Sequence, residues 1–206
     1  ATDLRLKCQV SDGVTVDHEI RVVGDGVQFS ITAKNSTGSA SNIHWAQPCV
    51  RVGEFTGLHD EKDKYRYIRK CFIFAGGQPQ FLPSAGWQEK ALYVPGQVWR
   101  APGVSEKDVN PRPLNPNVPE DGVIGCISGD GKLLLGIAFE PWQELFQGVI
   151  ECIHADFRLG GIPAGETKRV RGKFYFLPND PAALLRRYRE EFRRSEPKSS
   201  GPATKN

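Results

Sequence analysis

Alternating hydrophobic and polar positions dominate the first three-quarters of the chain. Residues 4–10, 19–23 and 27–33 each alternate along their length, and a short glycine-aspartate-glycine turn at 24–26 separates the last two. Successive side chains of a strand point to opposite faces, so this pattern predicts strands with one buried face. Glycine and aspartate in so short a turn are typical of a β-hairpin.

More strand-like segments follow, separated by turn-forming residues. They cover residues 43–55, 67–74, 122–128, 132–139, 146–154 and 168–177. Pro48 interrupts the first of these segments, which predicts a bulge or an edge position there. Residues 76–119 are rich in proline and lack a regular period, so we expect a long loop of the kind that forms a lid or a binding wall.

A helical period appears only near the end of the chain. Four apolar residues fall on one stripe of a helix that Asn179 or Asp180 can cap, namely Leu184, Leu185, Tyr188 and Phe192. We therefore predict one amphipathic helix over residues 180–194, followed by a disordered tail over 195–206. The fold class is then all-β: a single domain over residues 1–194, built as an antiparallel β-sandwich of supersandwich or jelly-roll type with one C-terminal amphipathic helix.

Composition and charge narrow the class of protein. The net charge is +3, but the chain from Arg186 onward holds seven Lys/Arg and three Asp/Glu, so the remainder, with 20 basic and 21 acidic residues, stands at −1. A near-neutral body offers no basic footprint for nucleic acid, and no apolar run is long enough for a membrane span. The chain begins at Ala1 and contains no Met, which predicts a processed, exported protein in a secreted or periplasmic location.

Five cysteines lie inside apolar runs: Cys8, Cys49, Cys71, Cys126 and Cys152. An odd number leaves at least one unpaired within the chain, and none has the spacing of a zinc knuckle. We expect most of them to behave as small buried hydrophobic residues, and one or two disulfides between neighbouring strands are the alternative. Nothing in the sequence requires a cofactor, and the binding of a single divalent metal ion is left as an alternative.

Two segments together resemble a known class of sandwich. The first, VQFSITAKNSTGSASNIHWAQPCVRV, joins an amphipathic strand to a strand with an aromatic residue and a proline. The second, CIHADFRLGGIPAGETKRVRGKFYFLPNDPAALLRRYREEF, runs from a strand through a PAGET turn to a last strand and a helix. They resemble the closing portion of galactose-mutarotase-like sandwiches, a superfamily with domains of glycoside hydrolases, polysaccharide lyases and sugar epimerases. The whole chain also resembles secreted bacterial proteins without an assigned role, and the resemblance implies carbohydrate as the partner.

The first candidate site is a histidine–aspartate pair. On a strand, Cys152, His154 and Asp156 project from one face, and two glycines follow shortly afterwards. This predicts a position at the rim of the sheet, where the pair could provide a general base or metal ligands. A purely structural hydrogen bond between the two is the alternative.

The remaining candidates are aromatic, polar and cationic side chains. Trp45, Gln47 and Arg51 would share a face, with His44 opposite, and could stack a sugar ring and bind its hydroxyls. Further candidates for substrate binding are Trp87, Trp99, Arg100 and Arg158. The alternative for the tryptophans is packing in the core.

Three functions remain open from the sequence. We expect a secreted carbohydrate-active enzyme, a polysaccharide lyase or glycoside hydrolase in which His154 and Asp156 transfer protons. A non-catalytic glycan-binding module would use the same aromatic residues. A metal-dependent enzyme would be built on His44 and His154.

Overall fold

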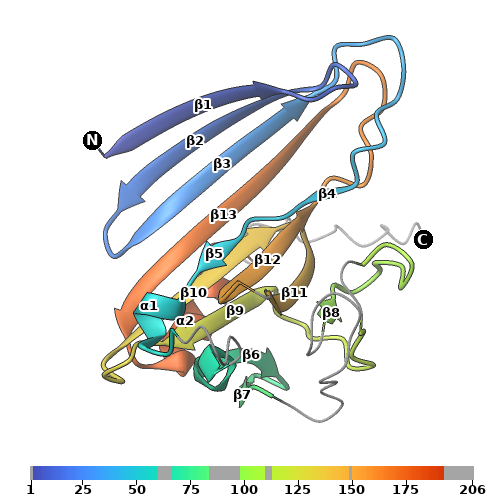
Figure 1. Cartoon of the computed structure of the whole chain (residues 1–206). Helices are drawn as coiled ribbons and strands as arrows, with labels where there is room; N and C mark the ends of the chain where they lie inside the picture. The colour runs from blue at the N-terminus through green and yellow to red at the C-terminus, as the bar shows by residue number, and fades with distance from the viewer. Residues whose placement is uncertain (1, 60–65, 84–97, 110–112, 149, 193–206) are drawn as a thin grey trace, which may run out of the picture.

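The computed structural model describes residues 2–59, 66–83, 98–109, 113–148 and 150–192 (Figure 1). The strands of its larger sheet are β1 (Asp3–Gln9), β2 (Thr15–Val23), β3 (Gly26–Lys34), β6 (Cys71–Ala75), β7 (Gln78–Phe81), β9 (Val123–Ile127), β10 (Leu133–Glu140) and β13 (Thr167–Pro178). Those of the smaller sheet are β4 (Trp45–Ala46), β5 (Val50–Arg51), β8 (Val98–Arg100), β11 (Trp142–Gly148) and β12 (Cys152–Arg158). Three helical segments are α1 (Gly53–Thr56), the 3-10 helix η1 (Arg66–Lys70) and α2 (Pro181–Phe192).

Both sheets are antiparallel, and they face each other as the layers of an open sandwich. The larger has eight strands in the order β1-β2-β3-β13-β10-β9-β6-β7. The smaller has five, in the order β4-β12-β11-β8, with β5 also paired to β12. The predicted all-β sandwich is thus confirmed.

The main core lies between the two sheets. Leu135, Ile137 and Phe139 alternate along β10 and are buried, and the facing strand β12 contributes a second buried row, Ile153, Ala155 and Phe157. The rings of Phe139 and Phe157 meet across the interface with centroids 5.6 Å apart. Each such side chain contributes about 1.5–3 kcal/mol of burial free energy, so this contact fixes the register of β12.

Helix α2 covers the opposite face of the larger sheet. The predicted stripe is buried there against a second cluster that includes Phe72, Leu134 and Tyr175. Its first turn is capped by Asp180, whose Oδ1 accepts a hydrogen bond from the amide of Ala183 at 3.0 Å. The helix prediction is confirmed, and the predicted tail over 195–206 lies outside the described residues. No described helix is both long enough and apolar enough to cross a membrane.

Three predicted segments differ from the structure. The single strand expected over residues 146–154 is wrong, since β11 and β12 form a hairpin whose turn includes Glu151 at a φ of 56°. The long strand expected over 43–55 is reduced to β4 and β5, and the chain then enters α1. The region 76–119 was predicted to be irregular but contains β7 and β8. In the first case apolar residues continue through the turn, so the pattern does not mark the reversal. In the second case β4 and β5 run in one direction along β12, and the interruption between them includes Pro48.

Candidate functional site

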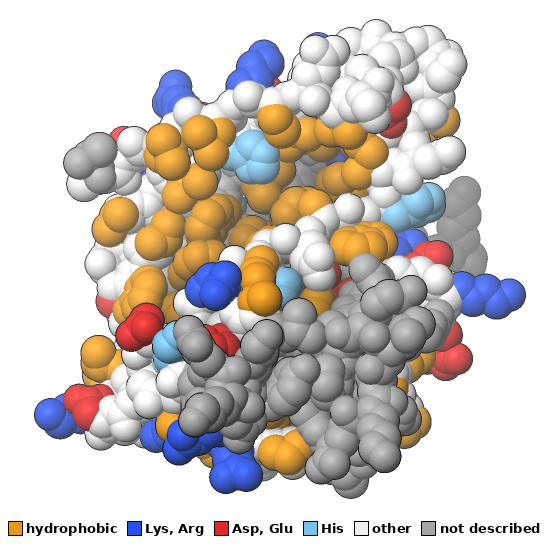
Figure 2. All heavy atoms as spheres, viewed as in Figure 1, with side chains coloured by type: hydrophobic (Ala, Val, Ile, Leu, Met, Phe, Trp, Pro, Cys, Tyr) orange, Lys and Arg blue, Asp and Glu red, His pale blue; other side chains and the backbone are white. Residues whose placement is uncertain are grey.

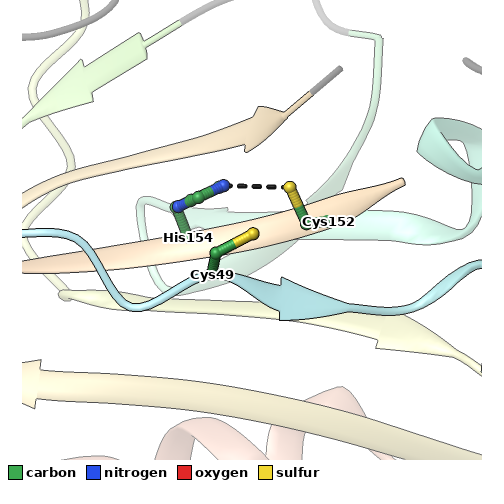
Figure 3. Close-up of side chains that lie close together, drawn as sticks. All are labelled: Cys49, Cys152 and His154. Atoms are coloured by element: carbon green, nitrogen blue, oxygen red, sulfur yellow. Dashed lines mark hydrogen bonds between the residues drawn. The ribbon is translucent and has the colours of Figure 1, made fainter. Parts of the chain in front are cut away.

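Three side chains with metal-binding atoms converge beside the smaller sheet. Cys152 and His154 lie on β12, and Cys49 comes from the segment just before β5 (Figure 3). The two Sγ atoms and the imidazole nitrogen all lie within 4.8 Å of one another. Cys152 Sγ is 3.0 Å from His154 Nε2. Cys152 and His154 are only 1% and 4% exposed, whereas Cys49 is exposed, so one side of the cluster reaches the surface.

The neighbouring strand β11 makes room for this cluster. Gly148 is the Cα partner of Cys152, and a Cβ at Gly148 would lie 2.3 Å from Cys152 Sγ and 3.0 Å from His154 Nε2. Any larger residue would therefore occupy the space that the thiol and the imidazole need. Phe146, the partner of His154, stacks on the imidazole with ring centroids 4.1 Å apart and planes 4° apart. The stacking fixes the plane of the imidazole ring.

Tyr67 locks the end of the β11–β12 hairpin. Its hydroxyl donates to the carbonyl oxygens of Gly148 at 2.7 Å and of Cys152 at 3.0 Å, and so contacts both strands. Tyr67 is fully buried, which makes these bonds costly to lose. The position of the Cys152 backbone is therefore determined by the 3-10 helix η1 as well as by the sheet.

A second histidine supports the turn that precedes Cys152. His59 Nδ1 lies 2.5 Å from the buried carboxylate of Glu151. Gly53 allows this position, because a Cβ there would lie 2.3 Å from Glu151 Oε2. Nothing in the local sequence pattern pointed to a contact between His59 and Glu151.

Burial holds Cys152 and His154 in their neutral forms. It raises the pKa of Cys152 to about 12, with the Cys49 thiol adding to the rise and Arg51 opposing it. Burial also lowers the pKa of His154 to about 4, which the backbone carbonyl of Pro48 partly opposes. At neutral pH, a protonated thiol therefore faces a neutral imidazole.

Two buried carboxyl groups lie beyond the imidazole. Asp156 and Glu144 are Cα partners across the β11–β12 ladder, and both are 0% exposed. Burial, followed by the charge of Glu144, raises the pKa of Asp156 well above its usual range. Asp156 Oδ1 is 3.6 Å from His154 Nδ1, which is too long for a hydrogen bond. The predicted rim position of the pair is wrong, because both side chains are buried within the sheet.

The other candidate residues are dispersed around this centre. His44 is exposed, and its carbonyl rather than its ring makes bonds, accepting from the amides of Leu159 and Gly160. Trp45 is half-buried, while Gln47 and Arg51 are exposed, and Arg51 is the Cα partner of Cys152. The structure thus brings His154 together with two cysteines, not with His44.

Most of the remaining aromatic and arginine candidates make contacts within the fold. Trp99 is 1% exposed, so its predicted availability to a ligand is wrong. Arg100 donates to the carbonyl of Val104 at 3.0 Å. Arg158 donates to Gln143 Oε1 at 2.7 Å and lies 3.2 Å from an Asp108 carboxylate oxygen. Trp87 lies outside the described residues.

All five cysteines are free thiols, but they differ in environment. Cys71, Cys126 and Cys152 are buried, which confirms the expectation for most of the cysteines, whereas Cys8 and Cys49 are exposed. No sequence pattern indicates that Cys49 and Cys152 meet, because they are far apart in the chain and come together through the pairing of β5 with β12.

No family model matches this sequence, and no curated protein matches it. Similar solved structures include a putative aldose 1-epimerase from Escherichia coli K12, with 10% identity and a TM-score of 0.46, over 85% of this chain and 65% of that one. A second putative aldose 1-epimerase, from Klebsiella pneumoniae, has 8% identity and a TM-score of 0.43, over 92% of this chain and 54% of that one.

A third similar structure is a protein from Synechocystis sp. PCC 6803, with 8% identity and a TM-score of 0.40, over 85% of this chain and 61% of that one. This chain therefore spans 54–65% of the length of these three structures. Aldose 1-epimerases have the galactose-mutarotase-like fold that the sequence resembles. At these values the similarity says nothing about a reaction or a substrate.

Proposed function

We propose that this chain is a carbohydrate-active metalloprotein whose centre is formed by Cys49, Cys152 and His154. The observation that supports the centre is the approach of three soft donor atoms to within 4.8 Å of one another. A tetrahedral zinc ion, with bonds of about 2.3 Å to sulfur and about 2.0 Å to nitrogen, separates its ligand atoms by roughly 3.5–3.8 Å. Opening the 3.0 Å contact between Cys152 and His154 by about half an ångström would accommodate the ion.

The donor set favours zinc over a hard cation. Thiolate and imidazole are the ligands that zinc prefers, whereas calcium and magnesium require oxygen. Two cysteines and one histidine also leave the fourth position of a tetrahedron open, as in catalytic zinc sites. Because Cys49 is exposed, that open side lies toward solvent.

The surroundings of His154 suit a metal ligand. With Nε2 directed at the cation, Nδ1 carries the proton and faces Asp156 Oδ1 at 3.6 Å. A small rotation of either side chain would form the carboxylate–histidine–metal arrangement that orients most histidine ligands. The stacked Phe146 ring restricts the imidazole to its plane and so favours this arrangement.

A cysteine nucleophile paired with His154 fits the cluster less well. That chemistry needs a thiolate beside a protonated imidazole, so the thiol pKa falls and the imidazole pKa stays high. Burial has the opposite effect here, because it raises the pKa of Cys152 to about 12 and lowers the pKa of His154 to about 4. A bound cation would replace the thiol protons and remove the cost of burying thiolate charge.

The proposal of a carbohydrate substrate is supported by the segment that carries Cys49. Trp45 is half-buried and Gln47 and Arg51 are exposed along this segment, offering a stacking surface, an amide and a cation. His154 and Asp156 are buried, so they would act on a sugar only through the metal-bound position. We therefore assign contact with the sugar to Trp45, Gln47 and Arg51.

Cobalt(II) titration of the purified, metal-stripped chain tests the centre. One equivalent should bind and give a sulfur-to-cobalt charge-transfer band that zinc then removes. Cys49→Ser, Cys152→Ser and His154→Ala should each weaken binding by at least roughly 100-fold, since even loss of a ligand's hydrogen-bond partner costs 10–100-fold. Cys8→Ser, an exposed thiol in the other sheet, is the matched control.

The absence of a thiolate band would refute the metal centre. The substrate is tested separately, by measuring binding of the zinc-loaded protein to a panel of polysaccharides. Trp45→Ala and Arg51→Ala should each reduce binding while leaving the cobalt spectrum unchanged. Wild-type protein that binds cobalt but no glycan would refute the carbohydrate assignment alone.

A further inference from the structure

One face of the β1–β3 region is apolar and open to solvent. Leu4, Leu6 and Val22 are 52%, 50% and 55% exposed, which is high for large hydrophobic residues in a sheet. Strand pairing places them on one face with a set of half-buried neighbours: Val16, His18, Ile20, Val27 and Phe29. Figure 2 shows hydrophobic side chains gathered over these strands, around a hollow in the surface.

The opposite face of the same strands is charged and internally paired. Arg5 lies 3.7 Å from Glu19, and Lys7 lies 3.7 Å from Asp17, each across the β1–β2 pairing. In an antiparallel sheet with charged residues on one face and aliphatic residues on the other, the aliphatic face is normally covered. The charged face is therefore the one that meets water.

The described part of the smaller sheet does not extend over this apolar face. That sheet packs on β9 and β10 and ends at β4, which is only two residues long. Figure 1 shows β1, β2 and β3 running beyond it as the upper part of the larger sheet. The eight-stranded layer is thus covered on this side over only part of its width.

We propose that a second copy of this chain covers the face, so that the β1–β3 regions of two molecules pack sheet to sheet around a twofold axis. The exposed side chains of the face amount to on the order of 500 Å² per copy, and the pair would bury on the order of 1,000 Å², the lower limit of a specific interface. Two antiparallel sheets stack face to face in this way at about 10 Å separation.

The chemistry of the face favours a copy of itself over a charged partner. The polar side chains within it are Cys8 and His18, which lie 3.9 Å apart and contact each other. Neither carboxylates nor ammonium groups would be desolvated when two such faces meet, so no unpaired charge would be buried. An acidic or basic ligand would find no partner here.

Sedimentation velocity of the zinc-loaded 206-residue chain over a range of concentrations tests the proposal. We expect a dimer that dissociates on dilution. Leu6→Asp and Leu4→Asp should each weaken it by roughly 100-fold or more, because two aspartates would then be buried without partners. Gln28→Asp, on the charged face of β3, is the matched control and should leave the dimer intact. The far-ultraviolet circular dichroism spectrum of each variant reports separately on its fold.

Labelling of the wild-type protein gives a second test that needs no variant. Cys8 is an exposed thiol on the proposed interface, and Cys49 is an exposed thiol elsewhere. In the metal-free chain, maleimide should modify Cys8 slowly in the dimer and rapidly after dilution, while the rate at Cys49 stays constant. A chain that is monomeric at every concentration, or a dimer that Leu6→Asp and Leu4→Asp leave intact, would overturn the proposal.

Discussion

Replacing Gly136 by alanine would test how α2 is seated on the larger sheet. Gly136 lies in β10 beneath Leu184, which is fully buried at the helix–sheet interface. A Cβ at Gly136 would be 2.6 Å from Leu184 Cδ1 and 2.8 Å from Cδ2. Carbon atoms do not pack that closely, so either the leucine must leave its rotamer or the helix must lift from the sheet.

The size of the effect follows from overpacking and cavity formation. Gly136→Ala should destabilise the protein by about 1–3 kcal/mol, the usual cost of adding a methyl group to a filled core. Leu184→Ala should cost about 2–4 kcal/mol, because it removes buried surface and leaves a cavity. In the double variant, the alanine methyl at position 136 enters that cavity. The two costs should therefore not add, and the coupling should favour the double variant by about 1–2 kcal/mol.

Urea unfolding followed by circular dichroism measures all three variants against the wild type. Gly38→Ala is the control, because no atom lies within 4 Å of the Cβ position there, and it should change the free energy of unfolding by less than about 0.5 kcal/mol. If Gly136→Ala has the wild-type midpoint, or if the two single costs simply add, the helix does not press on this strand as described.

Three further variants test other contacts. Arg189→Ala removes a two-point contact at 3.1 and 2.7 Å with the buried carboxylate of Asp121 and should cost about 1–3 kcal/mol in urea unfolding, against less than about 0.5 for exposed Arg186→Ala. Tyr67→Phe should cost about 1–2 kcal/mol and also weaken cobalt binding, because it frees the Cys152 backbone. The Arg187 contact lowers the pKa of Asp25, so its contribution is present above about pH 4 and is lost as the pH falls further; with both side chains partly exposed, Arg187→Ala should cost less than about 0.5 kcal/mol at pH 7, and this cost should diminish as the pH falls below about 4.

The elements that sequence reasoning recovered are those whose pattern is local. The β2–β3 hairpin has an alternating period and a glycine turn, and α2 has a capped apolar stripe, so each is encoded within a dozen or so residues. The hairpin between β11 and β12 was missed, since apolar residues run on through the turn and the reversal depends on Glu151 at a positive φ, which few non-glycine residues adopt. Trp99 was misjudged for a related reason: β8 pairs with β11 rather than with a sequence neighbour.

The candidate site was only half visible in the sequence for the same physical reason. Alternation along one strand correctly grouped Cys152, His154 and Asp156 on a single face. Cys49 joins them through long-range pairing of the segment that carries it, and its local sequence has no metal-ligand spacing. Burial could not be read either, because it depends on both neighbouring strands. The histidine proposed from sequence as the second ligand, His44, was therefore replaced by two cysteines.

The two faces of β12 explain why its ligands are held in place. Ile153, Ala155 and Phe157 are packed in the core between the sheets, and Cys152 and His154, which alternate with them, are part of the same backbone. Moving either ligand would therefore disturb the core, whereas Cys49 is exposed and lies outside any strand. A cation would find the donor atoms of Cys152 and His154 already fixed, whereas the Cys49 thiol would have to be ordered on binding. The entropy lost on binding then falls on the short segment before β5, at about 1–2 kcal/mol per backbone residue ordered. The affinity of the centre is thus set largely by how well that segment holds the Cys49 thiol over the strand.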